Sequence, residues 1–210
     1  MKTSITRTLA GVAAIAAIAV TASACSSSKD SSKPVADIAS LTGQTTAVAL
    51  DKGFTDALTT LKLTPGTVGT AKLESGSLIF PITGGHVTYY KPGSVSPFVQ
   101  GDIKHDGSGL SLTAGSIKVE LTNFDIDPGA SKLYGDVSVN GTKAATHAYL
   151  FYLDGTTLKA LQTSGNTAIL EGTKVEISPD AAGLLNQTFK TDAVKANLLV
   201  GIAKITVNTK

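Results

Sequence analysis

The three histidines are the residues of this sequence with the widest chemical use, because an imidazole can bind a metal ion or transfer a proton. They are His86, His105 and His147. Each lies in, or at the end of, a different predicted strand, so their spacing does not by itself predict a shared metal site. We therefore predict no metal ligands and leave two roles open for these side chains: structural hydrogen bonds, or contact with a ligand.

One group of carboxylates could bind a cation. Asp125 and Asp127 flank Ile126, so on a strand they would share one face, and with Asp136 they could hold a calcium ion. The same stretch, Asp-Ile-Asp-Pro-Gly, is also typical of a tight turn in which aspartate side chains bond to nearby backbone groups. The turn is the simpler interpretation, and the cation site is its alternative.

A second group of carboxylates would suit a cell-envelope hydrolase. Two carboxyl groups about 5–10 Å apart can act as acid and base in glycoside hydrolysis, and the candidates are Asp102, Asp106 and Glu120. Sugar sites generally need aromatic platforms, whereas this chain has no Trp and only 5% aromatic residues. It also contains no nucleophile elbow, phosphate-binding loop or paired-cysteine motif. We predict no catalytic residues and a non-enzymatic role, with the hydrolase as an alternative.

The single cysteine, Cys25, lies at the end of an export signal. Lys2 and Arg7 precede twelve uncharged, mostly apolar residues, Leu9–Val20, and small residues follow; this order is typical of a secretory signal. As a helix the apolar run would span about 18 Å, less than the roughly 30 Å of a bilayer core. The stretch Ala22–Cys25 resembles the lipobox of bacterial lipoproteins, in which the cysteine is acylated and becomes the mature N-terminus. The alternative is an ordinary signal, with Cys25 as a free thiol.

The lipobox resemblance implies a division of the chain into three parts. Residues 1–24 are the signal peptide, and residues 25–44 are acylated Cys25 with a tether that includes the serine-rich, apolar-free stretch Ser26–Pro34. Residues 45–210 are one extracytoplasmic domain, anchored to the outer face of the cell membrane through lipid. The formal charge of +2 becomes zero without the leader's two basic residues, so we expect no nucleic-acid partner.

Most of residues 45–210 show alternating apolar and polar residues, broken by Gly, Pro, Asn and Asp. This pattern predicts a mainly β domain, an antiparallel β-sandwich or partly open barrel. Two helices are expected: residues 52–61, capped by Asp51, and a second that starts at Ser178-Pro179 and ends near Phe189. Turns are expected at residues 106–109, 127–129 and 140–141.

Two adjacent tyrosines precede a Pro/Gly-rich segment, Lys91–Phe98. Neighbouring strand residues face opposite sides of a sheet, so either Tyr89 or Tyr90 should face outward. An exposed tyrosine beside such a loop suits contact with an envelope protein or a small hydrophobic ligand. With His86 and His105, these tyrosines are our candidate ligand-binding residues. The alternative is a tyrosine at the rim of the sheet with its hydroxyl in water.

Several short motifs of the central region follow one another in a fixed order. They are Gly76–Pro81, Gly84-Gly85, Gly101 and His105, Gly109–Leu112, Val119–Phe124 and Leu133–Val137. This order resembles the HtaA-type domain of actinobacterial surface proteins, a family implicated in haem binding and uptake. The resemblance implies a β-rich exported domain and makes haem the candidate cofactor.

In that family a tyrosine of an early Ser-Phe-Arg-x-Tyr segment ligates the haem iron, and a downstream histidine assists. His105 matches the downstream position. The best match to the early segment is residues 53–57, where Ala57 takes the place of the tyrosine and offers no ligand atom. Haem capture would then need Tyr89, Tyr90 or His86 instead. We therefore predict a membrane-anchored binding or cell-surface protein without a cofactor, with HtaA-like haem binding as the alternative.

Overall fold

The computed structural model describes residues 33–210, which form one compact unit. The predicted signal peptide, the predicted acylation site Cys25 and the serine-rich stretch up to residue 32 lie outside the described residues. None of the helices within residues 33–210 has the length and apolar character needed to cross a bilayer.

The described unit consists mainly of strands. In chain order its elements are β1 (Ala36–Ile38), β2 (Gln44–Leu50), α1 (Lys52–Thr60), β3 (Thr64–Gly69), β4 (Lys72–Glu74), β5 (Ser77–Pro81), β6 (Gly84–Tyr89), β7 (Val99–Ala114), β8 (Ile117–Asp127), β9 (Lys132–Val139), β10 (Thr142–Asp154), the short 3₁₀ helix η1 (Gly155–Thr157), β11 (Gln162–Ser164), β12 (Thr167–Ile177), α2 (Pro179–Phe189) and β13 (Leu199–Asn208).

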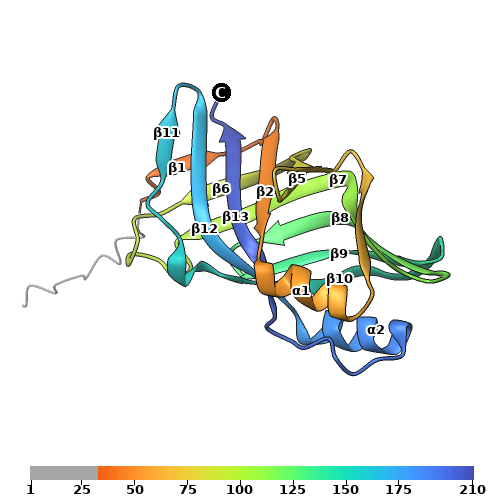
Figure 1. Cartoon of the computed structure of the whole chain (residues 1–210). Coiled ribbons are helices and arrows are strands. Elements are labelled where there is room, and N and C mark those ends of the chain that lie inside the picture. Colours follow the sequence, from red (N-terminus) through yellow and green to blue (C-terminus); the bar gives the residue numbers. More distant parts are fainter. Residues whose placement is uncertain (1–32) are drawn as a thin grey trace, which may run out of the picture. The chain divides into compact units, whose positions relative to one another are not determined.

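All strands belong to one antiparallel sheet, whose order is β1-β6-β7-β8-β9-β10-β12-β13-β2-β5-β4, with β3 added to β7 and β11 to β12. The sheet curls into a half-barrel (Figure 1). Thr83, which lies between β5 and β6, is hydrogen-bonded to β7. Its N–H donates to the Lys104 carbonyl (2.8 Å), and its hydroxyl accepts from the Asp106 N–H (2.9 Å). The predicted fold class is confirmed.

Both helices begin where their caps predict. The Asp51 carboxylate accepts from the N–H groups of Gly53 and Phe54, at 2.7 and 3.3 Å. The Ser178 hydroxyl accepts from the Ala181 N–H at 3.0 Å, and Pro179, at the first helical position, has no N–H that would need an acceptor. The two helices lie at the same end of the half-barrel (Figure 1).

The turn expected at residues 106–109 is wrong, because β7 runs without interruption from Val99 to Ala114. The register instead shifts between His105, opposite Phe124, and Gly109, opposite Thr122. Asn123 adopts a left-handed conformation (φ 53°) in the facing strand, and its side-chain oxygen accepts from the Gly107 N–H at 2.9 Å. The Asp-Gly pair therefore forms a bulge within a strand rather than a turn between two strands.

Two glycines of the motifs noted above, Gly85 and Gly101, allow β6 and β7 to approach each other closely. Both have a positive φ, 111° and 116°. A Cβ on Gly85 would lie 2.1 Å from the Asp102 carbonyl oxygen, and one on Gly101 would lie 2.1 Å from that of His86. Only glycine fits at these two positions, so the close packing of the backbone explains why the sequence has Gly85 and Gly101 there.

Candidate ligand-binding site

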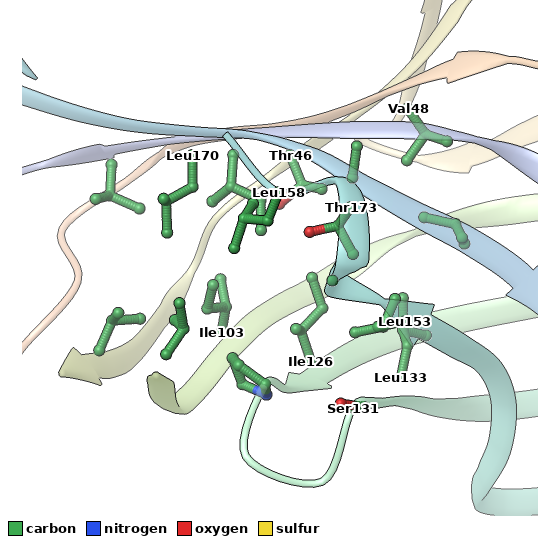
Figure 2. A pocket seen from close by; sticks show the side chains of 18 of the residues that line it. Thr46, Val48, Ile103, Ile126, Ser131, Leu133, Leu153, Leu158, Leu170 and Thr173 are labelled. Carbon is green, nitrogen blue, oxygen red and sulfur yellow. The ribbon is translucent and has the colours of Figure 1, made fainter. Parts of the chain in front are cut away.

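The half-barrel contains an apolar cavity of about 160 Å³. Its walls come from β1, β2, β5 to β10, β12 and β13, and from the segment 155–161. Figure 2 shows aliphatic side chains that face one another across it, such as Ile103 and Ile126 from one side and Leu158 and Leu170 from the other. The sequence predicted the strands but not this space, because a cavity depends on how side chains from distant strands meet.

Strand alternation positions the lining. On β13, Ala203, Ile205 and Val207 line the cavity, while Lys204 between them is exposed. The helices α1 and α2 lie at one end of the half-barrel, and none of their residues lines the cavity. The other end of the cavity is bordered by β1, Pro97 and Phe98, the β8–β9 turn and the segment 155–161. This second end is where we place the mouth of the cavity.

His105 lies in the wall of the cavity and is 1% exposed. Its Nδ1 lies 3.3 Å from the Phe124 carbonyl oxygen, which can only accept, so Nδ1 carries the proton. Its Nε2 then accepts from the Thr46 hydroxyl at 2.8 Å. Burial lowers the pKa of His105 to about 4, against the smaller raising effects of the Phe124 carbonyl and Asp106. The imidazole is therefore neutral at physiological pH, and both ring nitrogens are occupied.

The two candidate tyrosines lie on opposite faces, as alternation predicts. Tyr89 is buried, lines the cavity and packs edge-on against Phe98, with ring centroids 5.7 Å apart. Tyr90 is half-buried and is not among the lining residues. Its N–H donates to the Phe98 carbonyl oxygen at 2.7 Å, which starts the return of the chain toward β7. Of this pair, only Tyr89 can contact a molecule inside the cavity.

The other two histidines lie on the outer face of the sheet. His86 forms an ion pair with Asp102 when protonated, and more than half of its side chain is exposed. The His147 ring stacks on Tyr134, with centroids 4.4 Å apart and planes 10° apart, and its Nε2 lies 3.5 Å from Asp125. Neither residue lines the cavity. The structure therefore separates His86 from Tyr89 and His105, with which the sequence had grouped it.

The carboxylates proposed for hydrolysis are spread over the outer face. Asp102 pairs with His86 and lies 3.8 Å from Lys104, and Glu120 lies 2.6 Å from Lys118. Asp106 is exposed at the bulge. None of the three lines the cavity, and each lies on the opposite side of its strand from the buried neighbours.

The carboxylates proposed for calcium have separate local roles. Asp127 accepts from the Ala130 N–H at 2.8 Å, which is the turn interpretation of that stretch. Asp136 accepts from the Asn123 side chain at 3.0 Å and from the His147 N–H at 3.1 Å. Burial, followed by repulsion from Asp102, raises the pKa of Asp125. Within residues 33–210, no three His, Cys, Asp or Glu side chains are grouped as a metal site requires.

Thr46 is a site residue that the sequence analysis missed. It is 4% exposed and stands at an inward position of β2, two residues before Val48, which also lines the cavity. A polar residue on the apolar face of an alternating strand is the signal that could have found it, because such a group needs a buried partner. That partner, His105, lies 59 residues away in sequence.

Comparison with known proteins identifies the architecture. No protein-family model matches the chain, and a search of curated proteins finds no match. The solved C-terminal domain of HtaA from Corynebacterium glutamicum is similar, with a TM-score of 0.56 and 14% identity over 80% of this chain and 98% of that domain. The fold is HtaA-like. A domain-swapped dimer of a histidine-to-alanine variant of the same domain matches with a TM-score of 0.49 and 15% identity, over 75% of this chain and 90% of that one.

The HtaA-like fold places the two positions of the sequence resemblance in different pockets. Ala57, which takes the place of the family's tyrosine, lies on α1 and borders a small apolar space of about 30 Å³ together with Leu185 of α2. His105 lines the large cavity instead, and it shares that cavity with Tyr89. His105 and Tyr89 therefore line the same space, and residue 57 borders a separate one.

Proposed function

We propose that this chain is an exported, lipid-anchored binding protein that holds a small apolar molecule in the cavity of its half-barrel. The cavity is the observation that carries this proposal. An apolar space of about 160 Å³ within a protein is costly to leave unfilled, because its lining atoms would lack the partners that a packed core supplies. A ligand that fills the space restores those contacts and removes its own apolar surface from water, at about 25 cal/mol per Å².

The chemistry of the lining supports binding rather than catalysis. The buried imidazole is neutral and engaged on both nitrogens, so it supplies neither a charge nor a free base. The carboxylates considered for hydrolysis do not reach the cavity. A cavity of this kind selects a ligand by shape and apolar area, with few polar contacts to fix its orientation.

Membrane anchoring through Cys25 is the second part of the proposal, and the lipobox-like stretch Ala22–Cys25 supports it. Two or more acyl chains hold a protein stably at a bilayer. In the native host, Cys25→Ser should move the protein from the membrane fraction to the soluble one. A chain that stays in the membrane fraction after this substitution would rule out anchoring through Cys25.

Ligand binding is tested by titrating the full chain carrying Cys25→Ser with N-phenyl-1-naphthylamine, an apolar dye that fluoresces when removed from water. We expect saturable enhancement. Ala203→Phe fills the cavity from β13 and should weaken dye binding by at least about tenfold. Thr206→Phe adds the same ring to the outer face of the same strand and is the matched control. Equal binding by both variants would contradict the proposed site.

Haem is a second candidate ligand. The observation in its favour is that Tyr89 and His105 line one apolar cavity in a domain with an HtaA-like fold. Iron ligation by His105 would require Nε2 to give up the Thr46 hydroxyl at 2.8 Å. A hemin titration followed by visible absorbance, repeated on Tyr89→Phe and His105→Ala, decides between the candidates. A saturable Soret shift that either substitution weakens would favour haem over a smaller apolar molecule.

A further inference from the structure

We propose that the natural occupant of the cavity is the acyl chain of a membrane lipid. This inference rests on the proposed function, since it names the ligand class of the same cavity. Three observations support it: the way the aromatic rings around the cavity are packed, the few polar atoms on its wall, and the place where the N-terminal part of the chain joins the sheet.

The aromatic rings around the cavity leave no parallel pair between which a flat ligand could stack. Phe124 meets Phe80 at 79° and Phe151 at 82°, and Tyr89 meets Phe98 at 86°. Edge-to-face rings bind one another and present their edges or single faces to the remaining space. The rest of the wall is largely aliphatic, including the side chains labelled in Figure 2. A flexible alkyl chain can follow such an irregular wall, whereas a rigid planar molecule requires a slot.

The polar side-chain atoms on the wall of the cavity are few. Thr46 and His105 bond to each other. The hydroxyls of Tyr89, Ser131 and Thr173 remain as potential partners for a ligand, and Figure 2 shows the last two oxygens among aliphatic side chains. A molecule with a long apolar body and few polar groups matches this lining better than a molecule with polar groups on several sides.

The N-terminal part of the described chain joins the sheet beside the mouth of the cavity. The Val35 N–H donates to the Tyr89 carbonyl oxygen at 2.8 Å, and Ala36 and Ile38 of β1 line the cavity itself. Val35 is a hydrophobic residue that is 63% exposed. Val35 lies ten positions after Cys25, a distance of at most about 36 Å even when the chain is fully extended. An anchored chain therefore keeps the mouth close to the lipids that would supply the ligand.

The first experiment asks whether the ligand is an acyl chain. The Cys25→Ser full chain, which has no acyl acceptor, is loaded with N-phenyl-1-naphthylamine and titrated with palmitate or with pyrene. We expect palmitate to displace the dye completely, and pyrene to require a concentration about tenfold higher or more. Saturable dye binding that palmitate does not reverse would overturn the acyl-chain inference and leave the proposed function standing. Absence of dye binding would overturn both.

The second experiment identifies the source of the chain. The Cys25→Ser protein is incubated with phosphatidylcholine vesicles that contain a fluorescently labelled lipid, and then separated from them. We expect about one labelled lipid per protein, a large loss for Ala203→Phe and no loss for Thr206→Phe. Palmitate binding without uptake from vesicles would overturn the membrane source. So would uptake by the Cys25→Ser protein but not by the acylated protein, because the protein's own anchor would then fill the cavity.

Circular dichroism of both phenylalanine variants shows whether they fold. The palmitate and vesicle measurements on the chain without either substitution do not depend on that result, so the inference can still be refuted if Ala203→Phe fails to fold.

Discussion

The inner and outer faces of the half-barrel use the same residue type in opposite ways. His105 is enclosed by the sheet, neutral and bonded through both ring nitrogens. His86 and His147 are mostly exposed and lie beside Asp102 and Asp125. The inner histidine has no access to solvent with which to exchange partners, whereas the outer two can exchange theirs for water. Burial, rather than residue type, decides which histidine matters to the fold.

This difference has an energetic basis. A buried polar group that loses its partner costs about 1–3 kcal/mol, because water cannot replace the lost hydrogen bond. An exposed ion pair contributes about 0–1 kcal/mol, since solvent screens it and competes for it. Substitutions on the two faces should therefore have effects of different size, and the following predictions test that expectation.

The largest effect is expected for His105→Ala. It removes a buried ring and leaves the Thr46 hydroxyl and the Phe124 carbonyl without their partner. The free energy of unfolding should fall by roughly 3–5 kcal/mol, as for other large buried side chains replaced by alanine. Denaturant unfolding measures it. His86→Ala, on the outer face, is the control and should lower the same quantity by less than about 1 kcal/mol. Similar losses for both would remove the distinction between the faces.

A dependence of stability on pH is the next largest effect. The pKa of His105 is about 4 in the folded protein and 6.5 when unperturbed, because burial disfavours the imidazolium ion. Between these values the unfolded chain binds more protons than the folded one. The free energy of unfolding should therefore decrease as the pH falls from 6.5 to 4, by about 3 kcal/mol in total.

Unfolding measured at several pH values tests this dependence. The decrease should disappear from that window in His105→Ala and persist in His86→Ala. If His105→Ala retains the full slope, another group is responsible and the assignment to His105 is incorrect.

A smaller effect is expected at the mouth of the cavity. Asp154 accepts from the Thr156 N–H at 2.8 Å and lies 3.0 Å from Lys174; the Thr156 bonds, and then Lys174, lower its pKa to about 2. Asp154→Ala should cost about 1 kcal/mol and speed both amide hydrogen exchange in residues 155–161 and dissociation of the dye.

A cap at the other end of the half-barrel supplies the control for this prediction. Asp51→Ala removes the comparable cap of α1, which does not line the cavity. It should have a similar cost in stability and no effect on dye dissociation. Equal dissociation rates for the two variants would show that the segment 155–161 does not control entry.

The smallest effect is expected for His147→Ala. The His147 side chain is 63% exposed, and its contacts are the stacked Tyr134 ring and the Asp125 carboxylate at 3.5 Å. Thermal unfolding should show a loss below about 1 kcal/mol, and dye affinity should not change. A marked loss of affinity would mean that the outer face communicates with the cavity.

Much of the fold could be predicted from local signals. The caps at Asp51 and Ser178 mark both helix starts, because a short polar side chain satisfies free N–H groups there. Asn140-Gly141 marks the β9–β10 hairpin, where both residues have a positive φ. Such signals depend only on neighbouring residues, so the sequence contains all that is needed to interpret them.

The remaining features depend on residues far apart in sequence. The Asp-Gly pair at residues 106–107 predicted a turn, but Asn123 across the ladder holds Gly107 in a bulge. β1 already pairs with β6 at residues 36–38, within the stretch assigned to the tether. The partnership of His105 with Thr46 likewise depends on how the half-barrel closes. Composition and spacing carry no information about these pairings.

The wall of the cavity is assembled from nearly the whole length of the described chain. Its wall draws on ten strands, from Ala36 near the start of the described chain to Val207 near its end. A substitution at any of these positions can reshape the space while the ladder hydrogen bonds, which belong to the backbone, stay in place. The size and shape of the space can thus change through single side-chain replacements, while the strand order stays the same.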